Sequence, residues 1–155
     1  MKTLRTLALA GLTALAVAAR AEAPAAAPAS AAAPAAEAPK LDPSAAEAAK
    51  AAEAWLGLMD AGQYEQSWQE ASGLFRGKVT KERWVQQAQG VRGQLGKVTT
   101  RALDRSAPMK VEGADAWVLG WTSGLEKLPE AAEIVTMVKD GAAWRCAGYF
   151  IRPRS

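Results

Sequence analysis

Residues 133–152 read EIVTMVKDGAAWRCAGYFIR, and this stretch decides the fold of the chain. Its first seven residues form a nearly continuous apolar run with several β-branched side chains, which is typical of a buried strand. Asp140-Gly141 follows, a dipeptide that favours a tight turn between antiparallel strands. The stretch therefore predicts a β-hairpin with strands over 133–139 and 143–152.

Two more strands are predicted before this hairpin. Residues 115–125 (DAWVLGWTSGL) alternate, so that Trp117 and Trp121 fall on one face of a strand. Residues 97–103 (KVTTRAL) begin with β-branched side chains. Turns are expected at two further dipeptides, Glu112-Gly113 and Leu128-Pro129. The second half of the chain thus predicts a four-stranded antiparallel meander whose Trp-bearing face turns inward.

The residues before the strands have helical spacing instead. Ser44-Ala-Ala-Glu47 is a capping-box pattern, in which each side chain would accept a hydrogen bond from the other residue's backbone N–H. Apolar stripes at helical spacing then predict three helices. These run from Ser44 to a stop at Gly62, from Tyr64 to Phe75, and from a Thr80 cap to a stop at Gly96.

The predicted fold class is α+β, with three N-terminal helices packed on a curved four-stranded antiparallel meander. We divide the chain into a signal peptide over 1–21, an Ala/Pro-rich disordered linker over 22–40 and a single α+β domain over 41–155. A domain of that length holds one modest hydrophobic core.

The first residues have the order of a secretory signal peptide. Lys2 and Arg5 form a basic region, residues 7–18 (LALAGLTALAVA) are apolar, and Ala19-Arg20-Ala21 places small residues at the positions that a signal peptidase reads. The apolar run is too short for a stable membrane span. We therefore expect cleavage between Ala21 and Glu22 and export to the periplasm or beyond the cell. An uncleaved signal would instead anchor the domain near the membrane.

Residues 22–40 (EAPAAAPASAAAPAAEAPK) consist almost entirely of alanine and proline. Such a segment lacks the apolar surface needed to offset its ordering entropy, and its prolines interrupt any long helix. Two readings stay open: a spacer that lets the domain reach across the envelope, or a tolerated low-complexity leader.

The charge of the chain argues against a nucleic-acid partner. The full sequence has 19 basic and 16 acidic residues, a net charge of +3. Lys2, Arg5 and Arg20 would leave with the signal, and the remaining chain would then have equal numbers of basic and acidic residues. Nucleic-acid binding usually needs a concentrated basic surface, so no such partner is expected.

Few residue types that carry out catalysis are present. Cys146 is the single cysteine, so an intramolecular disulfide is excluded. We expect its thiol to be buried within a strand, while an exposed thiol would pair between chains. Histidine is absent from the sequence, and so are a nucleophile-elbow serine, a Gly-rich phosphate loop and calcium-loop spacing of acids. We therefore expect no catalytic residue, no metal site and no cofactor.

A series of short motifs runs through the predicted domain. They are AWL at 54–56, MDAGQY at 59–64, SW at 67–68, VR at 91–92, LGKV at 95–98, DG at 140–141, WR at 144–145 and GYFI at 148–151. Together they resemble an uncharacterised family of bacterial exported proteins, domain of unknown function 4019, over about residues 51–152. The pattern is also similar to the nuclear-transport-factor-2-like (cystatin-like) architecture, a cone of curved sheet with three N-terminal helices. The family has no established activity, so the resemblance implies a fold and a location but no reaction.

Aromatic residues are the first candidates for a ligand pocket. The chain has six tryptophans, and a cavity between helices and sheet could be lined by Trp117, Trp121 and Tyr149. The same tryptophans also fall on the predicted inward stripes, so the alternative is that they fill the core.

Three arginines are the second candidates. Arg92 flanks a helical stripe, and Arg101 and Arg145 interrupt apolar strand segments. If two of them converge at the mouth of the cone, they could bind a carboxylate or phosphate bidentately. Alternatively, they pair with acids across strands or extend from the outer face.

A carboxylate base is the third candidate. Enzymes that resemble this architecture use a buried carboxylate with a tyrosine or acid donor. Asp60 and Tyr64 are the nearest pair, but Gly62 between them ends a helix, and a structural role for both explains them as well. We expect no acid inside the apolar faces of the last three strands.

The function expected from the sequence is a non-catalytic exported binding or interaction module of the cell envelope. Its partner would be an envelope protein, a peptide or a small hydrophobic or anionic molecule. Two alternatives stay open: a small lyase- or isomerase-like enzyme with a pocket carboxylate, and a structural homodimer without a ligand pocket.

Overall fold

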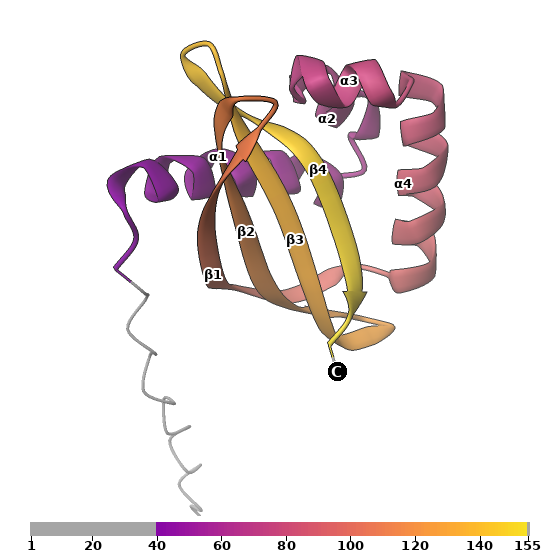
Figure 1. The fold of residues 1–155 in the computed structure, drawn as a ribbon. Coiled ribbons are helices and arrows are strands. Elements are labelled where there is room, and N and C mark those ends of the chain that lie inside the picture. Colours follow the sequence, from indigo (N-terminus) through magenta and orange to yellow (C-terminus); the bar gives the residue numbers. More distant parts are fainter. Residues whose placement is uncertain (1–39, 155) are drawn as a thin grey trace, which may run out of the picture. The chain divides into compact units, whose positions relative to one another are not determined.

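Helices followed by an antiparallel sheet make up the described part of the chain, residues 40–154 of a computed structural model (Figure 1). The helices are α1 (Pro43–Asp60), α2 (Tyr64–Glu70), α3 (Gly73–Lys78) and α4 (Lys81–Leu95). The strands are β1 (Val98–Val111), β2 (Ala114–Leu125), β3 (Leu128–Asp140) and β4 (Ala143–Pro153). This arrangement confirms the predicted α+β class. The predicted signal peptide, its cleavage site and residues 22–39 of the predicted linker lie outside the described residues.

The four strands pair in the order β1-β2-β3-β4, each antiparallel to the next, which confirms the predicted meander. Glu112 and Gly113, with φ of 50° and 86°, form the first turn, and Gly141, with φ of 66°, lies in the last one. The turn predicted at Leu128-Pro129 is wrong. Both residues belong to β3, because Leu128 already pairs with Leu125. Irregular register in all three pairings allows the strands to curve (Figure 1).

The segment predicted as one helix over 64–75 is two helices, so the described residues contain four helices rather than three. The chain becomes extended at Ala71 and Ser72, between α2 and α3. Ser72 donates its backbone N–H to the carbonyl oxygen of Cys146 in β4, at 2.8 Å, and its hydroxyl accepts from the N–H of Phe75. A bond to the sheet thus replaces the helical one, and the sequence pattern of the segment alone does not contain that contact.

The predicted caps agree with the structure at one helix and not at the other. Thr80 caps α4, since its hydroxyl accepts from the backbone N–H of Arg83. The capping box of Ser44 and Glu47 is wrong, because Asp42 is the N-cap of α1 and accepts from the Ser44 N–H at 2.8 Å. Ser44 and Glu47 are therefore free to contact the sheet.

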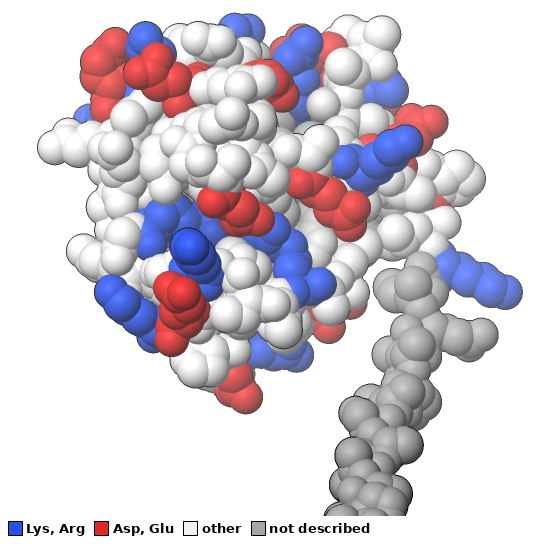
Figure 2. Space-filling model, turned by 180° about the vertical axis from the view of Figure 1, so that it is seen from behind, with Lys and Arg blue, Asp and Glu red and all other residues white. Residues whose placement is uncertain are grey.

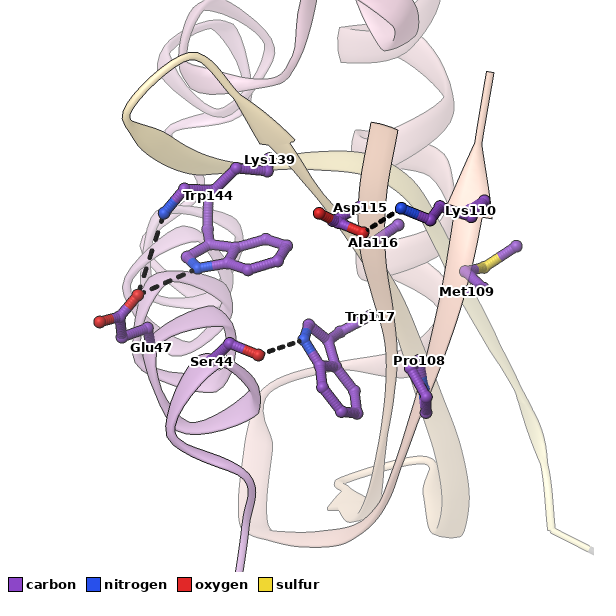
Figure 3. Close-up of a pocket in the computed structure, with 10 residues that line it drawn as sticks. All are labelled: Ser44, Glu47, Pro108, Met109, Lys110, Asp115, Ala116, Trp117, Lys139 and Trp144. Carbon is purple, nitrogen blue, oxygen red and sulfur yellow. Dashed lines mark hydrogen bonds and ion pairs between the residues drawn. The ribbon is translucent and has the colours of Figure 1, made fainter. Parts of the chain in front are cut away.

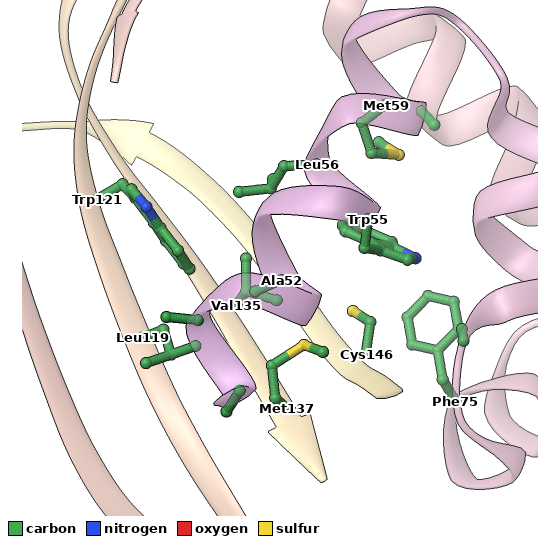
Figure 4. Packing of buried hydrophobic residues seen from close by; sticks show 14 of the residues in the cluster. Ala52, Trp55, Leu56, Met59, Phe75, Leu119, Trp121, Val135, Met137 and Cys146 are labelled. Carbon is green, nitrogen blue, oxygen red and sulfur yellow. The ribbon is translucent and has the colours of Figure 1, made fainter. Parts of the chain in front are cut away.

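The hydrophobic core lies between α1 and the concave face of the sheet (Figure 4). Alanines along α1 allow it to approach the strands closely, and Trp55, Leu56 and Met59 fill the space beyond them. Trp121 is buried in this core, and Trp117 lies half-buried beside it on the same strand face, as predicted.

The single cysteine also belongs to the core. Cys146 is fully buried, which confirms the predicted buried thiol, and burial raises its pKa to about 12. None of the helices within residues 40–154 has the length and apolar character needed to cross a membrane.

Candidate functional site

A cluster of charged and polar side chains lies inside the apolar core, centred on a glutamate of β3. Glu133 is completely buried, in phase with Val135 and Met137 on the inward face of the strand. Its neighbours come from α1, α4, β1, β2 and β4. We refer to this group as the Glu133 cluster: Asp60, Arg92, Arg101, Ser123, Glu133 and Tyr149.

The Glu133 carboxylate accepts four hydrogen bonds from side chains. Its Oε2 accepts from Arg101 Nε and from the Ser123 hydroxyl, both at 2.7 Å. Its Oε1 accepts from the Tyr149 hydroxyl at 2.8 Å and from Arg92 Nη2 at 3.2 Å. Two oxygens with four donors have their ordinary acceptor capacity filled. The buried charge is thereby compensated by the protein itself.

Asp60 closes the cluster at its solvent side. Arg101 donates to both Asp60 oxygens, from Nη1 to Oδ2 at 2.6 Å and from Nη2 to Oδ1 at 3.1 Å. Arg92 Nη1 also lies 3.1 Å from Oδ1. Two guanidinium groups therefore share two carboxylates, and their charges balance. Of the three candidate arginines, Arg92 and Arg101 lie together in the structure. They bind acids of the chain itself, which is the pairing alternative.

Proton transfer is disfavoured in this cluster. Burial by itself would raise the pKa of Glu133, but hydrogen bonds from Arg101 and Ser123 outweigh it and hold that pKa below its ordinary value. Burial and the nearby Glu133 charge raise the pKa of Tyr149. Burial acts to lower the pKa of Arg101, but its bonds to Asp60 and Glu133 raise it overall. A weak base beside a weak acid is a poor pair for general acid–base catalysis.

One donor of the cluster is left without a partner. Arg92 is 7% exposed, and among residues 40–154 its Nε is the buried side-chain nitrogen or oxygen that lacks a hydrogen bond. Its guanidinium carbon lies 5.8 Å from the centre of the Tyr149 ring. Buried donors are nearly always paired, so this unpaired N–H carries a desolvation cost inside the cluster. Arg92 also lines a hollow, but its Nε itself is buried and does not face it.

That hollow is a groove of about 450 Å³ between α4 and β4, and Arg92 lines it. We call it the α4–β4 groove. Its apolar lining comes from both elements: Trp84, Ala88 and Val91 of α4, and Tyr149, Phe150 and Ile151 of β4. Val91 is 42% exposed and Phe150 is 68% exposed, so large apolar surface remains in contact with solvent there.

The two halves of β4 differ in what covers their outer edge. In the first half, the carbonyl of Cys146 accepts from Ser72 at the start of α3, and the Arg145 guanidinium donates to the Glu70 carbonyl at 3.2 Å. In the second half, Tyr149, Phe150 and Ile151 line the α4–β4 groove instead. Within the described residues β4 pairs with β3 alone, so this half presents an unpaired strand edge.

A second hollow, of about 490 Å³, lies where the hairpins approach the first turn of α1 (Figure 3). We call it the tryptophan hollow. The Trp117 indole donates to the Ser44 hydroxyl at 3.1 Å, and the Trp144 indole donates to Glu47 at 3.4 Å. Lys139 lies over the Trp144 ring at 5.1 Å. Both indole N–H groups are therefore used within the protein, and the rings line the hollow.

Charged side chains line the hollows at the solvent side of the Glu133 cluster. Figure 2 shows acidic side chains interspersed with basic ones on one face of the molecule. Acids lie among the bases there, and Glu126 accepts a hydrogen bond from the backbone N–H of Lys97 at 3.0 Å. This mixed charge does not form a basic patch. The charged residues that line the hollows at this position are Asp60, Arg92, Lys97, Arg101, Glu126 and Lys127.

The structure separates the residues predicted to share one pocket. Tyr149 lines the α4–β4 groove, Trp117 lines the tryptophan hollow, and the Trp121 side chain is buried in the core. Arg145 does not join the other two arginines, because it lies at the covered half of β4. Asp60 binds arginines, and Tyr64 packs against the core cluster.

The most deeply placed acid was missed by the sequence analysis. We expected no acid within the apolar faces of the last three strands, and Glu133 contradicts this. The usable signal was its alternation with Val135 and Met137, which puts it on the inward face. Glu133 was instead counted within a nearly continuous apolar run over 133–139.

The comparison with known families gives one match. Residues 51–149 match the family described as Protein of unknown function (DUF4019). The chain belongs to this family. The matched DUF4019 region spans every residue of the Glu133 cluster and all of α4. A search of curated proteins found no match to the chain.

Proposed function

We propose that this DUF4019 protein is a non-catalytic binding module, exported to the bacterial cell envelope, that binds an extended apolar segment of a partner protein. The segment would lie in the α4–β4 groove and pair with the open half of β4 as a fifth strand. The observation that carries the proposal is the combination of an unpaired strand edge and an apolar groove along the same residues, 149–151.

Strand addition fits this place because its two requirements are met side by side. The backbone of an edge strand offers hydrogen bonds to any extended peptide, and pockets beside it select the side chains. The exposed Phe150 and Val91 supply apolar contact on the two walls.

A non-catalytic role is supported by the state of Glu133. A general base needs a free lone pair near the substrate, and four donors of the chain occupy this carboxylate. The enzyme alternative would need another base, and Asp60 is held by two arginines.

Architecture and location are the other parts of the proposal. Helices packed on the concave face of a curved meander support a nuclear-transport-factor-2-like cone (Figure 1). Export rests on the signal-like order of residues 1–21. Bacterial origin rests on the resemblance of the domain to a family of bacterial exported proteins. Mass spectrometry of the expressed protein tests export: cleavage before Glu22 is the expected result, and an intact Met1 in exported protein contradicts it.

Binding is tested with a blocked peptide of alternating valine and threonine, titrated by calorimetry and followed by amide hydrogen exchange. The amides of residues 149–151 that point to the open edge, away from β3, should become protected when the peptide binds. A peptide with a central proline lacks one backbone donor and should bind more weakly. Protection elsewhere, or equal binding of both peptides, contradicts strand addition.

A pair of glycine variants locates the site. A Cβ added at Gly90, which lines the groove, or at Gly57 on α1 would meet no atom within 4 Å, so both tolerate a side chain. Gly90→Leu should fill the groove and abolish peptide binding, whereas Gly57→Leu should leave it unchanged. Sedimentation in the absence of peptide tests the homodimer alternative, since a second copy on β4 would give a dimer that Gly90→Leu dissociates.

A further inference from the structure

A group of arginines lies on the outer face of the sheet, away from the helices. Trp121 and Glu133 point inward, so their neighbours Thr122 and Ala132 point outward. A Cβ added at Gly120 would lie 2.9 Å from Arg105 Cγ and Nε, which places the Arg105 side chain on this outer face. Arg152 pairs with Ala132, and the Arg154 guanidinium reaches the Thr122 hydroxyl.

These side chains surround a hollow of about 160 Å³, which we call the arginine hollow. Its lining comprises Asp104 and Arg105 of β1, Gly120, Trp121 and Thr122 of β2, Ala132 and Glu133 of β3, and Arg152 and Arg154 at the end of β4. The missing side chain of Gly120 makes the hollow possible. A side chain at position 120 would occupy the space that the Arg105 side chain now takes across the sheet.

Positive charge exceeds negative charge at this hollow. Asp104 is one of two acids in the lining, and its carboxylate is 4.0 Å from Arg154 Nη2. The other is Glu133, whose carboxylate is occupied by the inward cluster. Among residues 40–154, neither Arg105 nor Arg152 forms an ion pair within 4.0 Å. The arrangement is the opposite of the Glu133 cluster, where every guanidinium group has a carboxylate.

We infer that the arginine hollow binds a compact oxyanion of the phosphate class. Guanidinium groups donate in a planar fork that matches two oxygens of such an anion. The Thr122 hydroxyl adds a neutral polar group at the floor. The volume suits a single phosphate group, either free or at the end of a phosphomonoester, and not a whole nucleotide. This site lies on a different face from the inward side chains of the α4–β4 groove and does not depend on the proposed peptide binding.

Calorimetry of the purified protein with inorganic phosphate at low ionic strength tests the inference. Saturable binding is expected, and Arg105→Gln and Arg152→Gln should each weaken it roughly tenfold, the effect of one charge-assisted hydrogen bond. Arg83→Gln is the matched control, because it removes the same charge from the exposed side of α4. Absence of saturable binding, or equal weakening by all three variants, overturns the site.

A charge-preserving variant separates the hollow from a general effect of positive charge. Gly120→Ala keeps all three arginines, but its Cβ would displace the Arg105 side chain. Phosphate affinity should fall several-fold while the variant keeps a cooperative unfolding transition. Unchanged affinity in a folded Gly120→Ala protein overturns the geometry proposed here, and a variant that fails to fold leaves the decision to the two arginine variants.

The source of the phosphate group is determined with vesicles that contain phosphatidic acid. If a lipid headgroup is the source, the protein should sediment with these vesicles, Arg152→Gln should release it, and inorganic phosphate should compete. Binding of inorganic phosphate without vesicle binding assigns the site to a soluble phosphate. Vesicle binding that survives both arginine variants contradicts a role of this hollow at membranes.

Discussion

The two polar ends of the concave side of the sheet differ in how their hydrogen bonds are completed. At the Glu133 cluster, four donors from four elements meet one carboxylate, and that carboxylate is completely buried. At the tryptophan hollow, two indole N–H groups bond to the first turn of α1, but the rings still line a space of about 490 Å³. One end is closed by the chain itself, and the other is open.

The difference follows from the charge of the groups involved. An unpaired buried charge costs several kcal/mol, so a carboxylate inside the core persists only when its partners are all present. An indole at a half-buried site loses little when its hydrogen bond is long, because water can replace the acceptor. We therefore expect substitutions at the Glu133 cluster to reduce stability far more than substitutions at the tryptophan hollow.

The largest effect is expected for Glu133→Gln. The amide keeps the size of the side chain but leaves Arg92 and Arg101 with one carboxylate between them, which should lower the free energy of unfolding by about 3–5 kcal/mol. Urea unfolding followed by tryptophan fluorescence measures it. Asp60→Asn is the matched control and should cost about 1–2 kcal/mol, because the Asp60 side chain is 32% exposed and water can reach the freed guanidinium groups. Equal costs at the two positions would contradict the ranking by burial.

Acid should act on the same cluster. Since the folded-state pKa of Glu133 is depressed, its contribution to stability is present above the unfolded-state pKa, about 4.3, and is lost as the pH falls through the folded-state value. The free energy of unfolding should therefore decrease below about pH 4 in the wild-type protein. Glu133→Gln should show a shallower decrease over this range. If the free energy of unfolding falls equally with pH in both proteins, other carboxylates cause the loss of stability in acid.

The sequence predicted the fold more fully than the site. Alternation of apolar residues and the Asp140-Gly141 turn predicted the β3–β4 hairpin, because both signals are local. The break between α2 and α3 depends on the bond from Ser72 to Cys146, which joins residues far apart in the chain. A local pattern does not contain such a contact.

The candidate site divides in the same way. Arg92 was identified because it flanks an apolar helical stripe and Arg101 because it interrupts an apolar strand segment, and the structure brings them together. Glu133 was missed because an acid at the start of an apolar run is usually the exposed end of a strand. Its partners come from four other positions in sequence, and only their meeting makes a buried carboxylate tolerable.

The labelling rate of the Cys146 thiol measures how often the core around it unfolds. Burial raises its pKa to about 12, so the folded protein should react with a thiol-specific disulfide reagent only through unfolding. Labelling at neutral pH should be slow in the wild-type protein and faster in Glu133→Gln, in proportion to the unfolded fraction. Rapid labelling of the wild-type protein without loss of structure would show an accessible thiol and contradict its buried position.

The smallest effects are expected at the tryptophan hollow. Trp117→Phe removes the hydrogen bond to the Ser44 hydroxyl and should lower the free energy of unfolding by about 1 kcal/mol. Trp144→Phe should cost less, because its bond to Glu47 is 3.4 Å long and exposed to water. Ser44→Ala should remove the same bond as Trp117→Phe, so the double variant should cost less than the sum of the two single changes. Additive costs would mean that the Trp117 indole stabilises the protein through packing alone. At the tryptophan hollow, α1 would then contribute by burying apolar surface of the sheet and not through the hydrogen bond of Ser44.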